Sequence, residues 1–81
     1  MLVEYEGAAI PEKLWRRWEP ALWRGLSHPT PDVRIRAIEL LTSERSRHPD
    51  LEPRLSQELS TLARDDRDAN VRRIAGAYGR P

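Results

Sequence analysis

The chain has 81 residues, with 14 Lys and Arg against 13 Asp and Glu and a formal net charge of +1. This length allows a single domain (residues 1–81) with a small core, and the charge is far from the strongly basic balance of a dedicated nucleic-acid-binding protein. Because the sequence has no cysteine, disulfides, thiolate metal sites and a cysteine nucleophile are excluded.

Residues 1–11 precede the first helical pattern and are predicted to form an N-terminal arm. They contain Glu4 and Glu6, lack a basic start and include no long apolar stretch, so they match neither a signal peptide nor a membrane span. We therefore expect a cytoplasmic protein without a membrane partner. The arm is either extended or an additional helical turn, and we expect it to cover the open side of the helices that follow.

The first helix is predicted from Glu12 to Ser27, and Pro20 in its middle is expected to kink or split it. Helical spacing places Trp15 and Trp18 on the apolar face, which predicts that both belong to the core. Trp23 projects outside this face. It is either a partly covered edge residue or an anchor for a partner, because Trp and Arg dominate interface hot spots.

Three further helices follow. A proline-rich turn over residues 27–31 leads into a second helix over residues 32–47, whose wide apolar arc requires cover from two sides. The third helix, residues 51–64, has Asp50 as its expected N-cap and a single apolar stripe typical of an outer helix. The fourth, residues 69–78, is expected to end at glycines.

The most informative feature is an internal duplication. Asp32-Val33-Arg34 followed by Ala37 is repeated 38 residues later as Asn70-Val71-Arg72 followed by Ala75, and a helix and a Pro- or Asp-rich turn precede each copy. This pattern resembles the HEAT family, in particular its bacterial form. The resemblance implies an all-α fold, an α-α superhelix of two HEAT-like helical hairpins with about four to five helices. Repeat 1 would span residues 12–47 and repeat 2 residues 50–79.

Each position of the motif has an expected role. Val33 and Val71 should begin the inner helix of each hairpin and pack onto the preceding outer helix. Ala37 and Ala75 are small, which allows the two helices of a hairpin to approach closely. The resemblance further implies a structural ladder, in which Arg34 reaches a turn aspartate of the next repeat, Asp66 or Asp68. His28 and Thr30 depart from the family pattern, which often has Asp at those positions.

The seam between the repeats should be filled from the second helix. Ile35 and Ile38 are expected to face the following repeat, whereas the corresponding positions of the last helix are Arg73 and Gly76. These residues predict a polar end to the stack, of the kind that terminal repeats need. We therefore expect a complete unit of two repeats.

Six residues are candidates for partner binding, and their alternative interpretation is a solvated surface. Those on the inner helices would line the concave side that HEAT-like proteins commonly use for partners, and the C-terminal arginines could meet an acidic protein or a phosphate backbone. The candidates are Trp23, Arg36, Glu39, Arg47, Arg72 and Arg73, with Ser43 beside them on the second helix and Arg80 near the C-terminus.

The sequence carries no recognisable catalytic or cofactor motif. His28 and His48 each precede a proline and lack a second ligand at metal-binding spacing. Ser43, Ser46, His48 and Asp50 have no nucleophile elbow or oxyanion turn with them, and there is no Gly-rich phosphate loop. We expect neither an enzyme, a metal nor a cofactor.

The leading hypothesis is a small HEAT-like interaction or scaffolding module that binds a protein partner or itself as a homo-oligomer. The alternative is a nucleic-acid-binding HEAT-like protein that uses an arginine-lined surface, although HEAT-like DNA-binding proteins such as alkylpurine DNA glycosylases have more repeats and more positive charge. A third class, a regulatory subunit related to phycobilin lyases, has no pigment-binding signal in this sequence.

Overall fold

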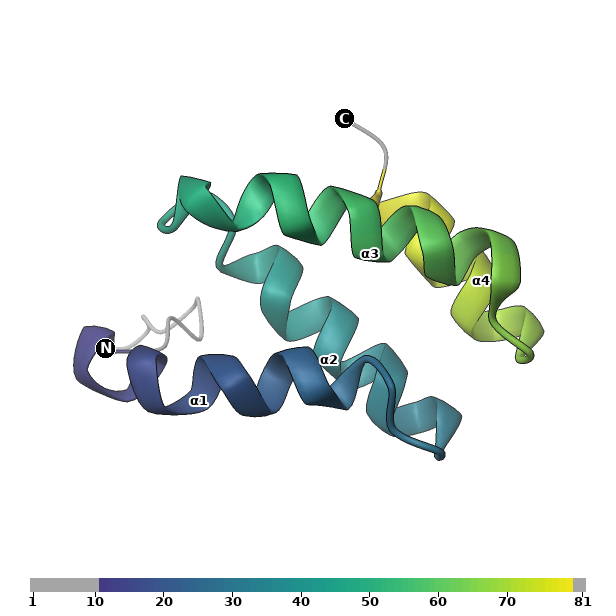
Figure 1. Cartoon of the computed structure of the whole chain (residues 1–81), viewed down its shortest axis with the longest axis horizontal. Coiled ribbons are helices and arrows are strands. Elements are labelled where there is room, and N and C mark those ends of the chain that lie inside the picture. Colours follow the sequence, from purple (N-terminus) through teal and green to yellow (C-terminus); the bar gives the residue numbers. More distant parts are fainter. Residues whose placement is uncertain (1–10, 80–81) are drawn as a thin grey trace, which may run out of the picture.

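The computed structural model describes residues 11–79, and every regular element in that part of the chain is helical (Figure 1). The prediction of an all-α fold is thereby confirmed. The expected N-terminal arm lies, apart from Pro11, outside the described residues, as does Arg80. The elements in chain order are α1 (Glu12–Gly25), α2 (Pro31–Ser43), a short 3-10 helix η1 (Pro49–Leu51), α3 (Glu52–Asp65) and α4 (Ala69–Tyr78).

The helices form two stacked antiparallel pairs. Helices α1 and α3 run side by side across the front of the molecule, α2 crosses behind them, and α4 lies behind α3 (Figure 1). Helix α1 packs on α2 and α3 packs on α4, while α2 also packs on α4. The wide apolar arc of α2 is therefore covered from two sides, as its sequence predicted.

The core runs through both pairs. Ile38, Leu41, Leu55, Leu59 and Val71 are among the fully buried side chains, and each such residue contributes about 1.5–3 kcal/mol relative to an exposed position. Ile38 fills the seam as expected, and Ile35 is partly buried against the core. The remaining core residues are Trp15, Trp23, Leu26, Ala37, Leu51 and Ala75.

The helices follow the predicted ranges with small shifts at their ends, such as α1 ending at Gly25 rather than at Ser27, and three features are worth describing. Pro20 lies inside α1, which continues through it without a split. Helix α2 ends at Ser43 rather than at Arg47, and turns follow. Asp50 is not an N-cap, because the chain first forms the 3-10 helix and α3 then starts after Leu51 without a side-chain cap.

Close approach within each pair involves a small residue. A Cβ atom added to Gly25 at the end of α1 would lie 3.0 Å from the Cβ of Ala37, whereas one added to Gly76 in α4 would lie 3.8 Å from the Cβ of Ala63. The first distance is shorter than an ordinary contact between two carbon atoms, and the second is an ordinary van der Waals contact. Ala37 is therefore the expected close-packing position, and Gly76 lies within α4, three residues before Gly79 at its end.

Two apolar residues expected in the core are exposed. Trp15 is buried as predicted, but Trp18 is 45% exposed and Val33 is 38% exposed, whereas Val71 is 0% exposed. Both predictions took a helix's own apolar face as evidence of cover. The cover itself depends on which neighbouring helices are present, and the second hairpin reaches only one side of the first.

Candidate interaction surface

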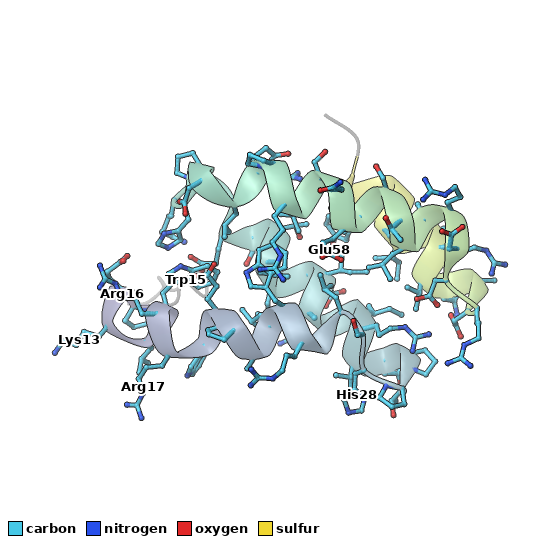
Figure 2. All side chains as sticks on the ribbon, viewed as in Figure 1. Lys13, Trp15, Arg16, Arg17, His28 and Glu58 are labelled. Carbon is cyan, nitrogen blue, oxygen red and sulfur yellow. The ribbon has the colours of Figure 1, made fainter. Side chains whose placement is uncertain are left out.

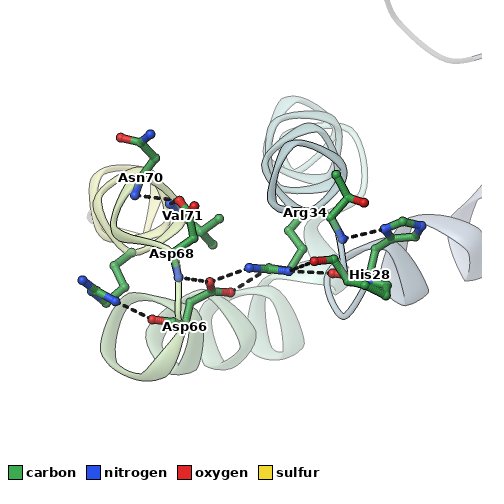
Figure 3. A network of polar contacts seen from close by, with 9 residues as sticks. His28, Arg34, Asp66, Asp68, Asn70 and Val71 are labelled. Atoms are coloured by element: carbon green, nitrogen blue, oxygen red, sulfur yellow. Dashed lines mark hydrogen bonds and ion pairs between the residues drawn. The ribbon is translucent and has the colours of Figure 1, made fainter.

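A buried ion pair joins the two hairpins near the N-terminal ends of α2 and α4 (Figure 3). The Nε and Nη2 groups of Arg34 donate hydrogen bonds to the two carboxylate oxygens of Asp66, at 2.9 and 2.8 Å. The Nη1 group donates to the backbone carbonyl oxygens of His28 and Pro29, at 2.7 and 3.0 Å. The side chains of Arg34 and Asp66 are only 7% and 5% exposed. The pair implied by the resemblance is thus present, in the bidentate geometry that favours Arg over Lys.

The environment of Asp66 lowers the pKa of its carboxyl group. Burial raises this pKa, but hydrogen bonds from Arg34 and from the backbone N–H of Asp68 outweigh it, together with the positive charges of Arg34 and Arg67. The pKa therefore lies below its ordinary value of 3.8, and the carboxyl group is charged at neutral pH. Asp66 and Arg34 thus form a charged pair that shields both groups from an uncompensated burial cost.

Asp68 does not pair with Arg34. Its carboxylate instead caps α4, accepting hydrogen bonds from the backbone N–H groups of Asn70 and Val71 at 2.8 and 3.1 Å. Thr30, in the same place before α2, makes no side-chain cap. The ladder expected over Arg34, Asp66 and Asp68 therefore consists of one ion pair and one helix cap.

The turn before α2 and the turn before α4 share two contacts. Arg72 donates to the backbone carbonyl oxygen of Asp66 at 2.6 Å, which repeats the contact of Arg34 with His28. His28 Nδ1 accepts from the backbone N–H of Thr30 at 3.0 Å, and an Asp66 carboxylate oxygen accepts from that of Asp68 at 2.9 Å. An imidazole nitrogen thus takes the acceptor position of an aspartate. The departure at His28 keeps the turn and replaces the acid.

The predicted partner-binding residues lie on separate segments. Arg36 and Glu39 on α2 pair with each other at 3.3 Å. Arg47 lies after α2 and pairs with Glu44 at 3.6 Å. Arg72 is partly buried by the contact just described, and Arg73 is exposed and donates to Asn70.

Trp23 is not outside the apolar face. It is 8% exposed, its Nε1–H donates to Glu19 at 3.1 Å, and the guanidinium group of Arg54 lies 4.1 Å from the ring centroid. This cation–π contact joins α1 to α3. The projection of α1 underestimated the width of its covered face, because α3 covers a side that the sequence pattern does not mark.

The uncovered side of the first hairpin carries apolar residues. Helix α1 packs on α2 as α3 packs on α4, and α2 and α4 also pack on each other. Val71 is completely buried whereas Val33 is 38% exposed, although α2 packs on α1, α3 and α4.

Trp18 is the other exposed large apolar residue of the first hairpin. It lies about 140° around α1 from Trp23, whose ring meets α3, so it points away from the second hairpin. We call the side chains of Trp18 and Val33, with partly buried Leu14 and Leu40, the open face.

Cations border the open face and continue along α1. Arg17 follows Leu14 by one helical turn, as Trp18 does, and Arg36 lies one turn from both Val33 and Leu40. Figure 2 shows Lys13 and Arg17 extending away from the other helices. The cations of α1, which form no ion pair with any described residue, are Lys13, Arg16, Arg17 and Arg24. Their clustering on one face was readable from helical spacing and was missed.

The structure also contains a buried carboxylate that the sequence did not indicate. Glu44 is 0% exposed, and His48 Nε2 lies 3.6 Å from it and 3.8 Å from a carboxylate oxygen of Glu12. The His48 ring stacks on Trp15 with centroids 4.6 Å apart. These contacts hold the turn after α2 against α1.

The described residues contain no group of three or more His, Asp or Glu side chains arranged to hold a metal ion. Within residues 11–79, no helix has the length and apolar character needed to cross a membrane. Comparison of the sequence with models of protein families found no match, and no curated protein or solved structure matched the chain either.

Proposed function

We propose that the chain is a non-catalytic, HEAT-like interaction module that binds a protein partner through the open face. The observation that supports this proposal is the difference between Val33 and Val71, which occupy equivalent positions of the repeat and are 38% and 0% exposed. A partner that lies beside Val33 would complete the same packing. Burial of a side chain of this size contributes about 1.5–3 kcal/mol.

The chemistry of the open face favours recognition of a protein. It combines a Trp that is 45% exposed with arginines at its border, and these are the residue types that carry most of the energy in protein interfaces. Large apolar side chains gathered on one side of a small monomer mark interaction sites more often than scattered ones do.

The test is a comparison of two variants of the full chain. Val33→Glu places a charge on the open face, and Ala77→Glu places one at an exposed position of α4. Affinity purification from the organism that makes the protein should recover a partner with the wild type and with Ala77→Glu, and lose it with Val33→Glu. Equal recovery with both variants would show that the open face does not bind the partner.

Nucleic-acid binding is the second candidate, and the observation that favours it is the set of four cations on α1 that form no ion pair within residues 11–79. Fluorescence anisotropy with a labelled single-stranded oligonucleotide would test it at low ionic strength, where phosphate contacts are strongest. Binding that weakens steeply with added salt, and is reduced by Arg16→Gln with Arg17→Gln, would support this function. Absence of binding at low salt would eliminate it.

A further inference from the structure

We infer that the occupant of the open face is an amphipathic helix with acidic residues beside its apolar stripe, and not a second copy of this chain. The inference rests on the proposed function, because it names the kind of partner that the same surface would bind. It follows from the helix that packs on α4 of the second hairpin and from the charges around the open face.

The chain itself indicates the shape of the occupant. The helix of the first hairpin that packs on α4 is α2, and it carries the fully buried Ile38 and the partly buried Ile35. These two residues are three apart and thus share one side of the helix. A helix that lies beside Val33 in the same way needs apolar residues at a spacing of three or four, facing Val33, Leu40 and Trp18.

The charges at the border select the flanks of that helix. Arg17 has no carboxylate partner among the described residues. Arg36 has only an exposed contact with Glu39, which contributes little to stability. Asp32 lies further round α2, one turn before Arg36. Two arginines on opposite edges of an apolar surface favour glutamate or aspartate on both sides of the stripe that binds there.

The same charges disfavour self-association. In a symmetric dimer through the open face, the arginines of one copy would face those of the other across a shared interface. In head-to-tail stacking, the open face would meet the free side of α4, where Arg73 is exposed and Arg72 is partly exposed. Both arrangements bring like charges together, which costs energy unless acidic groups lie between them.

Two designed peptides and the full chain test the inference. One probe is a labelled amphipathic helix with leucines at helical spacing and glutamates on both flanks, and the other has lysines in place of the glutamates. We expect the glutamate probe to bind about tenfold more tightly, which corresponds to about 1.4 kcal/mol. Reversal of both border charges, Arg17→Glu with Arg36→Glu, should invert this preference. Arg64→Glu with Arg73→Glu, at the far end of the stack, should leave it unchanged.

A photoreactive benzoylphenylalanine at position 33 identifies the occupant directly. Crosslinks to the glutamate probe, lost with Trp18→Glu, would support the inference. Far-UV circular dichroism would show that each variant remains folded, as expected for residues as exposed as Trp18 and Val33.

Four results would overturn the inference. Equal affinity for the two probes, or none for either, would remove the acidic helix as occupant. Crosslinks to a second copy would replace it with a dimer and leave the proposed use of the open face intact. Crosslinks within one chain, to residues 1–10, would show that the chain covers the face itself, and the proposed function would fail as well.

Discussion

The two hairpins share a motif and differ in their neighbours, and Val33 and Val71 measure that difference. Both begin an inner helix, 38 residues apart, and each precedes an arginine that donates to the same carbonyl position of its turn. Yet Val33 is 38% exposed and Val71 is 0% exposed. The repeated sequence therefore determines the local structure of each copy, while the position of a copy in the stack determines its burial.

The arginines show the same contrast in polar contacts. Arg34 makes four hydrogen bonds, two of them to Asp66 of the following hairpin. Arg72 makes one, to a carbonyl of its own hairpin. The ion pair of the first copy is thus made with the hairpin that follows it in the sequence.

The largest expected effect separates these two arginines. Arg34→Ala leaves the buried carboxylate of Asp66 without its cation and should lower the free energy of unfolding by about 3–5 kcal/mol. Arg72→Ala removes a single hydrogen bond and should cost about 1 kcal/mol. Urea unfolding followed by circular dichroism measures both. Similar losses for the two variants would mean that the bond between the hairpins contributes no more than the bond within one.

Alanine substitutions of the two valines should differ in their effect on stability, by less than those of the two arginines. Val71→Ala removes two buried methyl groups and should destabilise the chain by about 2 kcal/mol. Val33→Ala, at an exposed position, should change stability by less than about 0.5 kcal/mol. Thermal unfolding of the two variants under one buffer condition provides the comparison. A loss at Val33 as large as that at Val71 would show that some other part of the chain covers the open face.

The helices themselves were largely predictable from sequence. The period of the apolar residues located all four, and the expected leucine stripe is buried at Leu51 in η1 and at Leu55 and Leu59 in α3. Such a pattern works because a helix presents the same side every three or four residues, whatever it packs against. The resemblance implied a contact of Arg34 with Asp66 or Asp68, and the structure has it at Asp66, 32 positions away.

The distribution of exposed residues was less predictable, because it depends on neighbours. Trp18 was predicted in the core and is exposed, whereas Trp23 was placed outside the apolar face and is buried, because a projection of α1 alone does not show that α3 and its Arg54 cover the Trp23 side. Burial of Glu44 had no signal in the sequence beyond the nearby His48. The row of cations on α1, by contrast, was present in the helical spacing and needed only to be compared with the positions of the acids.

Alanine substitutions of two glycines should change stability in opposite directions. Gly25→Ala brings a methyl group to 3.0 Å from the Cβ of Ala37, which has no rotamer to change, so the helices must shift. We expect a loss of about 1 kcal/mol from this overpacking. Gly76→Ala meets Ala63 at an ordinary 3.8 Å and improves helix propensity, so it should stabilise the chain by about 0.5–1 kcal/mol. Urea midpoints that move in the same direction would contradict the difference in packing.

The smallest expected effect is on the pH dependence of stability. It arises from the ion pair between Arg34 of the first hairpin and Asp66 of the second. Because the pKa of Asp66 is lower in the folded chain than its ordinary value of 3.8, the unfolded chain binds a proton more readily, and stability falls as the pH decreases through the folded pKa. The contribution is fully present above the ordinary value. As the pH falls from 5 toward 3 it passes the ordinary value, so part of this contribution is lost in that range.

A matched variant isolates this contribution from those of the other acids. Arg34→Gln keeps a hydrogen-bond donor but removes the charge that helps to lower the pKa of Asp66, so its stability should depend less on pH over the same range. The wild type and the variant would be compared by urea unfolding from pH 3 to 7. Parallel curves would place the acid sensitivity elsewhere in the chain. Curves that converge at low pH would show that the proton acts on the pair that joins the hairpins.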